Sequence, residues 1–314
     1  MTKLKVLKEI KESIDKSIIP YDVEGAKIAS EVTSKYDPIL APTYNNIKST
    51  IHRYKNKKFP KEPKNINDIS NDPIYSAFLK TKRFTEFIRY IDEDICLCIS
   101  DSQLEIFSNS NELFIDGTFK AVPKFYKQLV IILGYIKEYD ATFAICFCFL
   151  KNKTYEIYSK FFDKLTEIVY TKDLKIITQK IHCDFELALV KAIRNAFNGQ
   201  IEIKYCFYHY YKNITKNFKK YKPTNKKSIY IYLLTLVLPF IEPNYVSNVF
   251  NKLVKDNYTD EIKDFILYYQ NYYLKENTFI EKWNYFGKKI NRTNNYCESY
   301  NNKINRYINR NKDF

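Results

Sequence analysis

Three consecutive runs of β-branched and aromatic residues in the middle of this sequence constrain its fold most strongly. They are Leu113–Ile115, Gln128–Tyr135 and Ala141–Leu150, and turn-like segments separate them. Such runs at short spacing predict an antiparallel meander. Because they are apolar at nearly every position, and not only at alternate ones, we expect both faces of the sheet to be covered.

A regular alternation of helix and strand patterns follows the meander. The periodicity predicts a helix over Thr154–Tyr170, a strand over Lys175–Cys183, a helix over Phe185–Phe197 and a strand over Ile201–Tyr208. A helix between two strands is typical of a parallel βαβ unit. The sequence therefore predicts an α/β protein with a mixed sheet, in which three antiparallel strands are followed by αβαβ.

The regions on either side of this core show mainly helical patterns. Residues 1–72 are predicted to form a helical N-terminal region that ends in an exposed, proline-containing linker at 55–65. Helical spacing continues over 73–91, and a short β-type run, Ile95–Ser100, precedes a polar turn at 101–111.

The C-terminal third is predicted to be helical throughout. We expect the first part of the core to span 73–209, an all-helical insertion to span 210–290, and a closing helix of the core to lie within 291–314, at Asn294–Asn309.

The net charge of the chain is +15, from 51 basic and 36 acidic residues. This balance favours an acidic partner such as nucleic acid or an anionic membrane surface. Only seven of the basic residues are arginine, and the chain is also rich in Asn, Ile and Tyr, which share A/T-rich codons with lysine. Codon usage can therefore account for part of the charge, and the motifs must decide the function.

Cysteine spacing and hydropathy indicate the compartment. The seven cysteines are scattered and form no CxxC pair, which excludes a disulfide framework. No run of about 18 uncharged apolar residues is present, as a membrane-spanning helix requires. We expect a soluble intracellular protein in a reducing environment, without a membrane partner.

Two acidic residues stand where strands should be apolar. Asp116 directly follows the first strand of the meander, and Asp184 follows the strand that ends at Cys183. Burying an unpaired charge costs several kcal/mol, so such acids need a purpose. If the two strands are neighbours, both acids reach one edge of the sheet, as metal-binding pairs do. The alternatives are a turn aspartate before Gly117 and a helix N-cap at Asp184.

A third acid is expected from a helix that packs across these strand ends, because a pair of Mg²⁺ ions needs carboxylates from several sides. Glu298 is the candidate, in the second turn of the closing helix. The alternative is a solvated helix glutamate.

Five segments in a fixed order resemble the Mutator-like (MULE) transposase domain over roughly residues 75–310. They are LFIDGTFKAVPKFYKQLVIILGY, KTYEIYSKFF, HCDFELALVKAIRNAF, CFYHYYKNI and WNYFGKKINRTNNYCESYNNKI. The resemblance implies a ribonuclease-H-like core of the DDE type with a helical insertion before the last acid, and cut-and-paste DNA transposition. Asp116, Asp184 and Glu298 would be the catalytic acids and would hold two Mg²⁺ or Mn²⁺ ions, which activate water and then a 3′-hydroxyl for attack on a phosphodiester. It also implies DNA as the partner and a homo-oligomer on DNA, and we expect a nuclear location.

Further residues are candidate accessory groups. Cys206 and His209 match a CxxH element of the family, and Asn295 lies one turn before Glu298. With His182 and Cys183 they could supply four zinc ligands, but adjacent strand residues point to opposite faces, so the sequence favours Mg²⁺ over zinc.

Basic and aromatic residues around these motifs are candidate DNA contacts, and the alternative is a solvated lysine-rich surface. Trp283 could stack on an unpaired base or anchor the core. The candidates are Lys212, Lys216, Lys219, Lys220, Trp283, Arg292, Lys303 and Arg306.

The sequence also departs from the family pattern. Members commonly begin with a zinc-binding DNA-recognition module, yet before Cys96 this sequence has only His52 and no cysteine. Members also usually continue beyond the last acid. We therefore expect a truncated element copy or a host-retained derivative, and two functions stay open: a DDE transposase, or a non-catalytic DNA-binding or regulatory protein derived from one.

Overall fold

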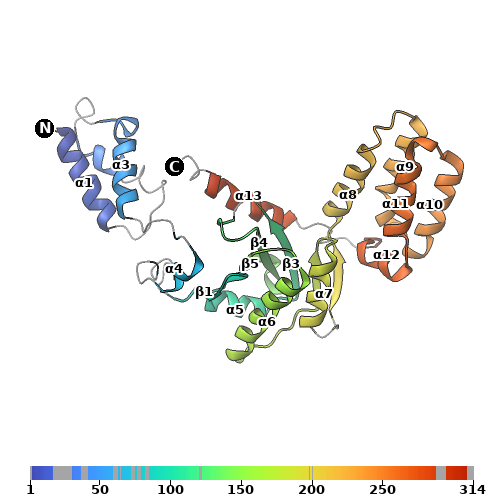
Figure 1. Cartoon of the computed structure of the whole chain (residues 1–314), viewed down its shortest axis with the longest axis horizontal. Helices are drawn as coiled ribbons and strands as arrows, with labels where there is room; N and C mark the ends of the chain where they lie inside the picture. The colour runs from blue at the N-terminus through green and yellow to red at the C-terminus, as the bar shows by residue number, and fades with distance from the viewer. Residues whose placement is uncertain are drawn as a thin grey trace. The chain divides into compact units, whose positions relative to one another are not determined.

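The structure is a computed structural model, which describes residues 2–16, 30–36, 42–58, 63, 65–71, 75, 79–81, 85–119, 122–197, 199, 201–287 and 295–309 (Figure 1). The chain divides into two compact units, Met1–Ala77 with Asn309–Phe314, and Phe78–Ile308. Within the described ranges, every helix is too short or too polar to span a bilayer.

The smaller unit contains helices α1 (Thr2–Lys16), α3 (Tyr44–Lys58) and α4 (Ile66–Asn71). A small core of Val6, Ile10, Val32, Ile47 and Ile51 holds it together. These residues recur at helical spacing on α1 and α3, so each helix buries one apolar stripe. The predicted linker at 55–65 starts too early, because Lys55–Lys58 form the last turn of α3.

The larger unit is built on one seven-stranded mixed sheet in the order β1-β2-β5-β4-β3-β6-β7. Antiparallel pairing joins β3 to β4 and β4 to β5, so the predicted meander is confirmed. Strands β6 and β7 extend the sheet in parallel on the other side of β3, as the βαβ pattern predicted. The strands are β1 (Ile88–Ile91), β2 (Ile95–Cys98), β3 (Glu112–Thr118), β4 (Gln128–Ile136), β5 (Ala141–Leu150), β6 (Lys180–Cys183) and β7 (Glu202–Tyr205).

Two local predictions before the meander are wrong. The helical spacing predicted over 73–91 is wrong for Ile88–Ile91, which form strand β1, because antiparallel pairing with β2 outweighs the short periodic pattern. Residues 73, 74, 76–78 and 82–84 of this prediction lie outside the described residues. The polar turn expected at 101–111 is instead helix α5 (Asp101–Ser108). Ser100 and Gln103 form a capping box, in which each side chain bonds the other residue's backbone N–H, and this begins the helix.

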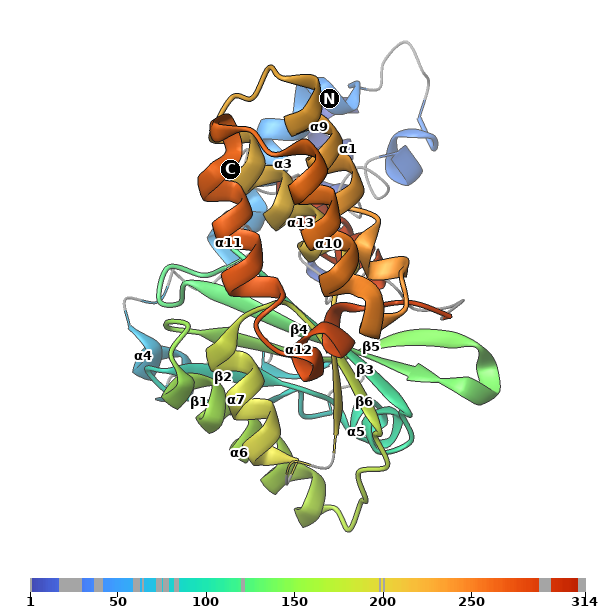
Figure 2. The ribbon, with the colours of Figure 1, turned by 90° about the vertical axis from the view of Figure 1, so that its right-hand side faces the viewer.

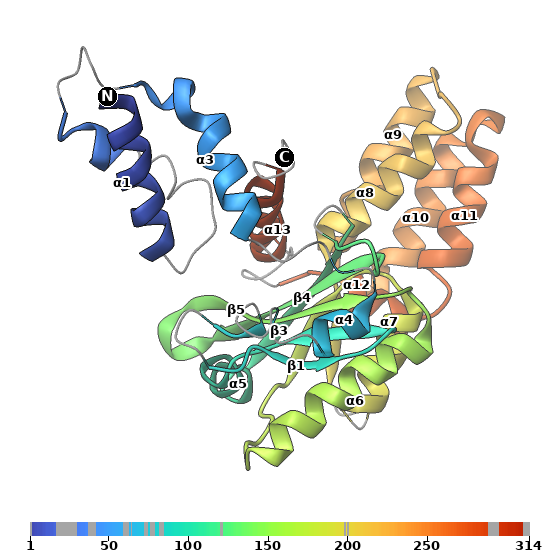
Figure 3. The ribbon, with the colours of Figure 1, turned by 60° about the vertical axis from the view of Figure 1, so that its left-hand side comes forward.

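Helices cover both faces of the sheet. Alternate β3 residues face opposite sides, so Leu113 and Ile115 pack with α5, α6 (Tyr155–Thr171) and α7 (Leu187–Ala196), whereas Phe114 packs with Cys297 of α13 (Asn295–Asn309). Figure 2 shows α6 and α7 side by side below the sheet, and Figure 3 shows α6 and α13 on opposite sides of it. The expectation that both faces are covered is therefore confirmed.

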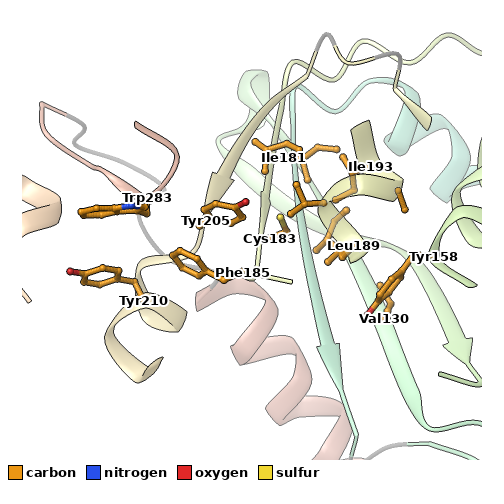
Figure 4. Packing of buried hydrophobic residues seen from close by; sticks show 14 of the residues in the cluster. Val130, Tyr158, Ile181, Cys183, Phe185, Leu189, Ile193, Tyr205, Tyr210 and Trp283 are labelled. Atoms are coloured by element: carbon orange, nitrogen blue, oxygen red, sulfur yellow. The ribbon is translucent and has the colours of Figure 1, made fainter. Parts of the chain in front are cut away.

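The described residues between β7 and α13 are helical apart from their connections. They form α8 (Phe207–Lys219), α9 (Lys226–Thr235), α10 (Pro243–Asn257), α11 (Lys263–Tyr273) and α12 (Asn277–Trp283). Aromatic rings fill their core: the indole of Trp283 stacks on Tyr210 with the ring centres 5.2 Å apart. A second stack, of Phe185 on Tyr205, continues this packing toward the sheet (Figure 4).

Candidate active site

Asp116 and Asp184 lie at the same end of two neighbouring parallel strands. The register of β3 and β6 pairs Phe114 with His182, and each aspartate follows two residues later in its own segment. Because alternate strand residues share a face, this register brings both carboxylates to one face of the sheet, the face that α13 covers.

The alternative interpretations of the two aspartates are wrong. Asp116 lies inside strand β3 and not in a turn. Helix α7 begins at Leu187 and its N-cap position is Glu186, so Asp184 does not cap it. Oδ1 of the Asp184 carboxylate accepts a hydrogen bond of 2.6 Å from the adjacent N–H of Phe185.

His209 brings an imidazole to both carboxylates. Its Nε2 lies 3.9 Å from Oδ1 of Asp116, and its Nδ1 lies 3.9 Å from Oδ1 of Asp184. These distances are too long for direct hydrogen bonds. The prediction of strand up to Tyr208 is wrong, since His209 is the third residue of helix α8. The helix brings it back toward the ends of β3 and β6.

Burial and a neighbouring carboxylate both disfavour a negative charge on Asp116. Burial raises the pKa of Asp116, and the neighbouring Asp184 carboxylate raises it further. The charges of His209 and Lys212 and the N–H of Gly117 act in the opposite direction without cancelling the increase. Asp116 is only 8% exposed, so a cation bound there would relieve both the burial of its charge and the repulsion from Asp184.

Asn301 is a site residue that the sequence analysis missed. Its Nδ2 donates a hydrogen bond of 2.7 Å to Oδ2 of Asp116. One turn earlier on α13, the Cys297 thiol lies 3.5 Å from the carbonyl oxygen of Phe114, so the helix is fixed against β3 at two points. The spacing of Asn301, three residues after Glu298, makes the two residues neighbours on a helix, but Asn294, Asn295 and Asn302 have equivalent spacings, so the sequence did not single it out.

The third predicted acid is only partly described. The backbone of Glu298 belongs to α13, between Cys297 and Asn301, whereas its side chain and that of Asn295 lie outside the described part of the structure. Arg292 also lies outside the described residues.

One protein family matches part of this chain. Residues 112–213 match the model of the MULE transposase domain, a segment that runs from β3 into α8 and contains Asp116, Asp184 and His209. This match covers about a third of the chain and supports its assignment to the MULE transposase family. No curated protein matches the sequence. The family implies DNA as the partner and a general dependence on divalent metal ions.

The carboxylates of this site suit a hard cation better than zinc. Asp116 and Asp184 supply carboxylate oxygens, with the imidazole of His209 beside them, and oxygen ligands are those that Mg²⁺ and Mn²⁺ prefer. Among the described residues, no group of three or more His, Cys, Asp or Glu side chains is arranged around one metal position. His182 is instead hydrogen-bonded to Glu112, at 2.8 Å, and Cys183 and Cys206 are buried.

Among the candidate DNA contacts, Trp283 is not available to DNA. Its side chain is completely buried, and its Nε1 donates to the carbonyl oxygen of Tyr273, so it anchors the helical core and cannot stack on a base. The remaining described candidates are exposed: Lys212, Lys216 and Lys219 on α8, Lys220 at its C-cap, and Lys303 and Arg306 on α13.

Proposed function

We propose that this protein is a DDE-type DNA transposase that hydrolyses phosphodiester bonds and transfers DNA strands with two divalent metal ions. The observation that carries the proposal is the placement of Asp116 and Asp184, which flank one imidazole, that of His209, at the ends of neighbouring parallel strands. In the proposal these acids and Glu298 hold the cations, Mg²⁺ or Mn²⁺. Multimeric assembly on DNA and a nuclear location belong to the same proposal.

The sheet topology supports a ribonuclease-H-like core. An antiparallel meander, β3 to β5, is followed by α6, β6, α7 and β7, with both later strands parallel to β3. The helix that closes this core, α13, packs on the face that carries the two aspartates and contains Glu298. An acid on this helix approaches the strand ends from a third direction, as a two-cation site requires.

The chemistry divides between the cations and the protein. The cations supply Lewis-acid activation of the attacking oxygen and neutralise charge on the leaving oxygen. The protein holds the carboxylates in place, through the Asn301 hydrogen bond to Asp116 and the N–H of Phe185 on Asp184. In the tautomer that carries its proton on Nε2, His209 has a free Nδ1 that can accept a hydrogen bond from a water held near Asp184.

Helix α8 provides a path for DNA that begins at the acids. Lys212 is close enough for its charge to act on Asp116, and it also lies 5.9 Å from the ring centre of Tyr208. Lysines bind the phosphate backbone, and exposed aromatic rings offer a face on which a base can stack. The exposed residues along this side of the helix are Tyr208, Tyr211, Lys212, Lys216, Lys219 and Lys220.

The experiment that tests the cation site is a calorimetric Mn²⁺ titration of the full chain beside Asp116→Ala, Asp184→Ala and Glu298→Ala, each checked for its fold by circular dichroism. We expect Mn²⁺ binding by the wild type and its loss in all three variants. Binding that survives in Asp116→Ala and Asp184→Ala would contradict the site. Mn²⁺-dependent nicking of plasmid DNA by the wild type alone would then establish the nuclease activity.

A second candidate is a transposase-derived protein that binds DNA without cutting it. The lysines of α8 favour this function, because they extend away from the acids over about two helical turns and do not depend on a metal. DNA binding without Mn²⁺ binding or nicking would establish this candidate in place of the enzyme.

A further inference from the structure

Only the nitrogen of the Asn301 side-chain amide makes a hydrogen bond. Nδ2 donates to Asp116, whereas Oδ1 is buried and has no hydrogen-bond partner. The residue is 8% exposed, so water from the bulk does not reach this oxygen freely. Buried polar atoms in folded proteins nearly always have a partner, and an exception points to a bound water or ion.

A second buried atom without a hydrogen-bond partner, Nδ1 of His209, lies in the same site. Five buried side-chain nitrogen or oxygen atoms lack a hydrogen-bond partner among the described residues, and two of them are Asn301 Oδ1 and His209 Nδ1. Both residues approach the Asp116 carboxylate: Asn301 lies at its Oδ2, and His209 lies at its Oδ1. Nδ1 of His209 lies 3.9 Å from Oδ1 of Asp184, so the two unsatisfied atoms belong to residues that contact the two aspartates. They indicate that the site is completed by a ligand that the chain does not supply.

We propose that the Asn301 carbonyl oxygen is part of the divalent-cation site, where it accepts a hydrogen bond from a water of the cation's hydration shell. This inference rests on the proposed function. The Nδ2 contact occupies one oxygen of Asp116 and leaves Oδ1, on the side of His209, for the cation. Mg²⁺ and Mn²⁺ sites keep several waters, and these waters need acceptors around them.

A purely structural role in docking α13 is the competing explanation. The helix is already held one turn earlier, where Cys297 is fully buried against Phe114. Tyr300 and Ile304 add further apolar contacts with the same cluster. Docking of the helix therefore has support that is independent of the amide, and loss of Asn301 should affect cation binding more than folding.

The test is a Mn²⁺ titration of the full chain carrying Asn301→Ala, Asn301→Asp or Asn302→Ala. Asn301→Ala should weaken Mn²⁺ binding by about 10- to 100-fold, the usual effect of removing such a supporting group. Asn301→Asp keeps an acceptor oxygen and should bind within about threefold of the wild type or tighter, since added carboxylate charge favours a divalent cation. Asn302 is its exposed neighbour on α13 and serves as the matched control, which should leave binding unchanged.

The outcomes separate this inference from the proposed function. Wild-type affinity in Asn301→Ala, or equal weakening in Asn301→Ala and Asn301→Asp, overturns the inference alone, provided that Asp116→Ala loses binding. Absence of Mn²⁺ binding in the wild type overturns both. If Asn301→Ala does not fold by circular dichroism, Asn301→Ser replaces it, because a serine hydroxyl is polar but too short to reach the position of Oδ1.

Discussion

Glu112, the first residue of β3, accepts a hydrogen bond of 2.8 Å from Nε2 of His182 on the neighbouring strand β6. The His182 ring also stacks on Phe114, with the ring centres 4.5 Å apart, and Lys180 lies 3.1 Å from the other Glu112 oxygen. These contacts lie on the face that carries Asp116 and Asp184. They fix the register of β3 and β6, and this register sets the two acids at the same level.

This relationship predicts how stability depends on pH. Burial alone would raise the pKa of Glu112, but the hydrogen bond from His182 and the contact with Lys180 outweigh it and lower the pKa from 4.5 to about 2. A lowered carboxyl pKa stabilises the folded state above pH 4.5, and this contribution is lost as the pH falls toward 2. Because Glu112 is partly exposed, solvent screening reduces the contribution to about 1 kcal/mol.

Glu112→Gln should therefore reduce the free energy of unfolding by about 1 kcal/mol at pH 7. Its difference from the wild type should shrink as the pH falls from 5 toward 3. Urea unfolding followed by circular dichroism at several pH values measures this difference. The exposed Glu138→Gln serves as the control, and a Glu112→Gln difference that stays constant with pH would refute the prediction.

The core position of Trp283 predicts a large effect on stability. Trp283→Ala should cost about 3–5 kcal/mol, because it removes a fully buried ring that packs on Tyr210. Trp283→Phe should cost less, through partial loss of packing and of the bond to the Tyr273 carbonyl. Trp283 is the only tryptophan, so its substitution removes the tryptophan fluorescence signal. Unfolding is therefore followed by circular dichroism. DNA affinity should not change in folded Trp283→Phe, whereas a selective loss would revive the stacking interpretation.

The α8 lysines predict a salt-dependent defect in DNA binding. Each phosphate contact contributes about 0.9 to the slope of log K against log salt concentration on duplex DNA. The double variant Lys212→Ala and Lys216→Ala should weaken binding and reduce this slope by up to about 2. Fluorescence anisotropy at several salt concentrations measures both quantities. The control is Lys137→Ala, in the β4–β5 turn at the far end of the strands. An equal effect of the control would mean that α8 is not a specific DNA path.

The sequence predicted the elements whose pattern is local and strong. Strand β5, helix α6 and helix α13 lie within one residue of their predicted bounds, because long runs of one periodicity leave little ambiguity. A helix was wrongly predicted where β1 forms, because a short strand depends on its pairing partner, here β2, which lies in another segment. Helix α5 was missed because its capping box is a side-chain signal and not a hydrophobic pattern.

Only the part of the site that lies at the strand ends could be predicted from the sequence. Asp116 and Asp184 are exceptions within apolar runs, and parallel pairing of their strands brings them together. Asn301 is different, because nothing in its local sequence distinguishes it from Asn302 or from the other asparagines of this Asn-rich helix. Its contact with Asp116 joins residues 185 positions apart and depends on how α13 docks on the sheet. Such a contact follows from tertiary packing and carries no local signal.

Asp184→Asn should separate catalysis from folding. The Asp184 side chain is 38% exposed, and the oxygen of asparagine can still accept the N–H of Phe185, so the free energy of unfolding should change by less than about 0.5 kcal/mol. The lost charge should reduce metal-dependent DNA cleavage by at least about 100-fold, because a neutral amide holds a divalent cation poorly. DNA affinity should stay the same or rise, since one negative charge near the phosphates is removed.

Plasmid nicking, unfolding and anisotropy measurements on the same preparation check these three expectations together. The matched control is Asp173→Asn, in the exposed turn after α6, where the backbone has a φ of 55° that asparagine also adopts readily. This variant should cleave DNA like the wild type. Full cleavage activity in Asp184→Asn would remove Asp184 from the cation site. Loss of DNA binding together with cleavage would instead show that Asp184 shapes the DNA-binding surface, because a residue that only holds a cation should not be needed to bind DNA without metal.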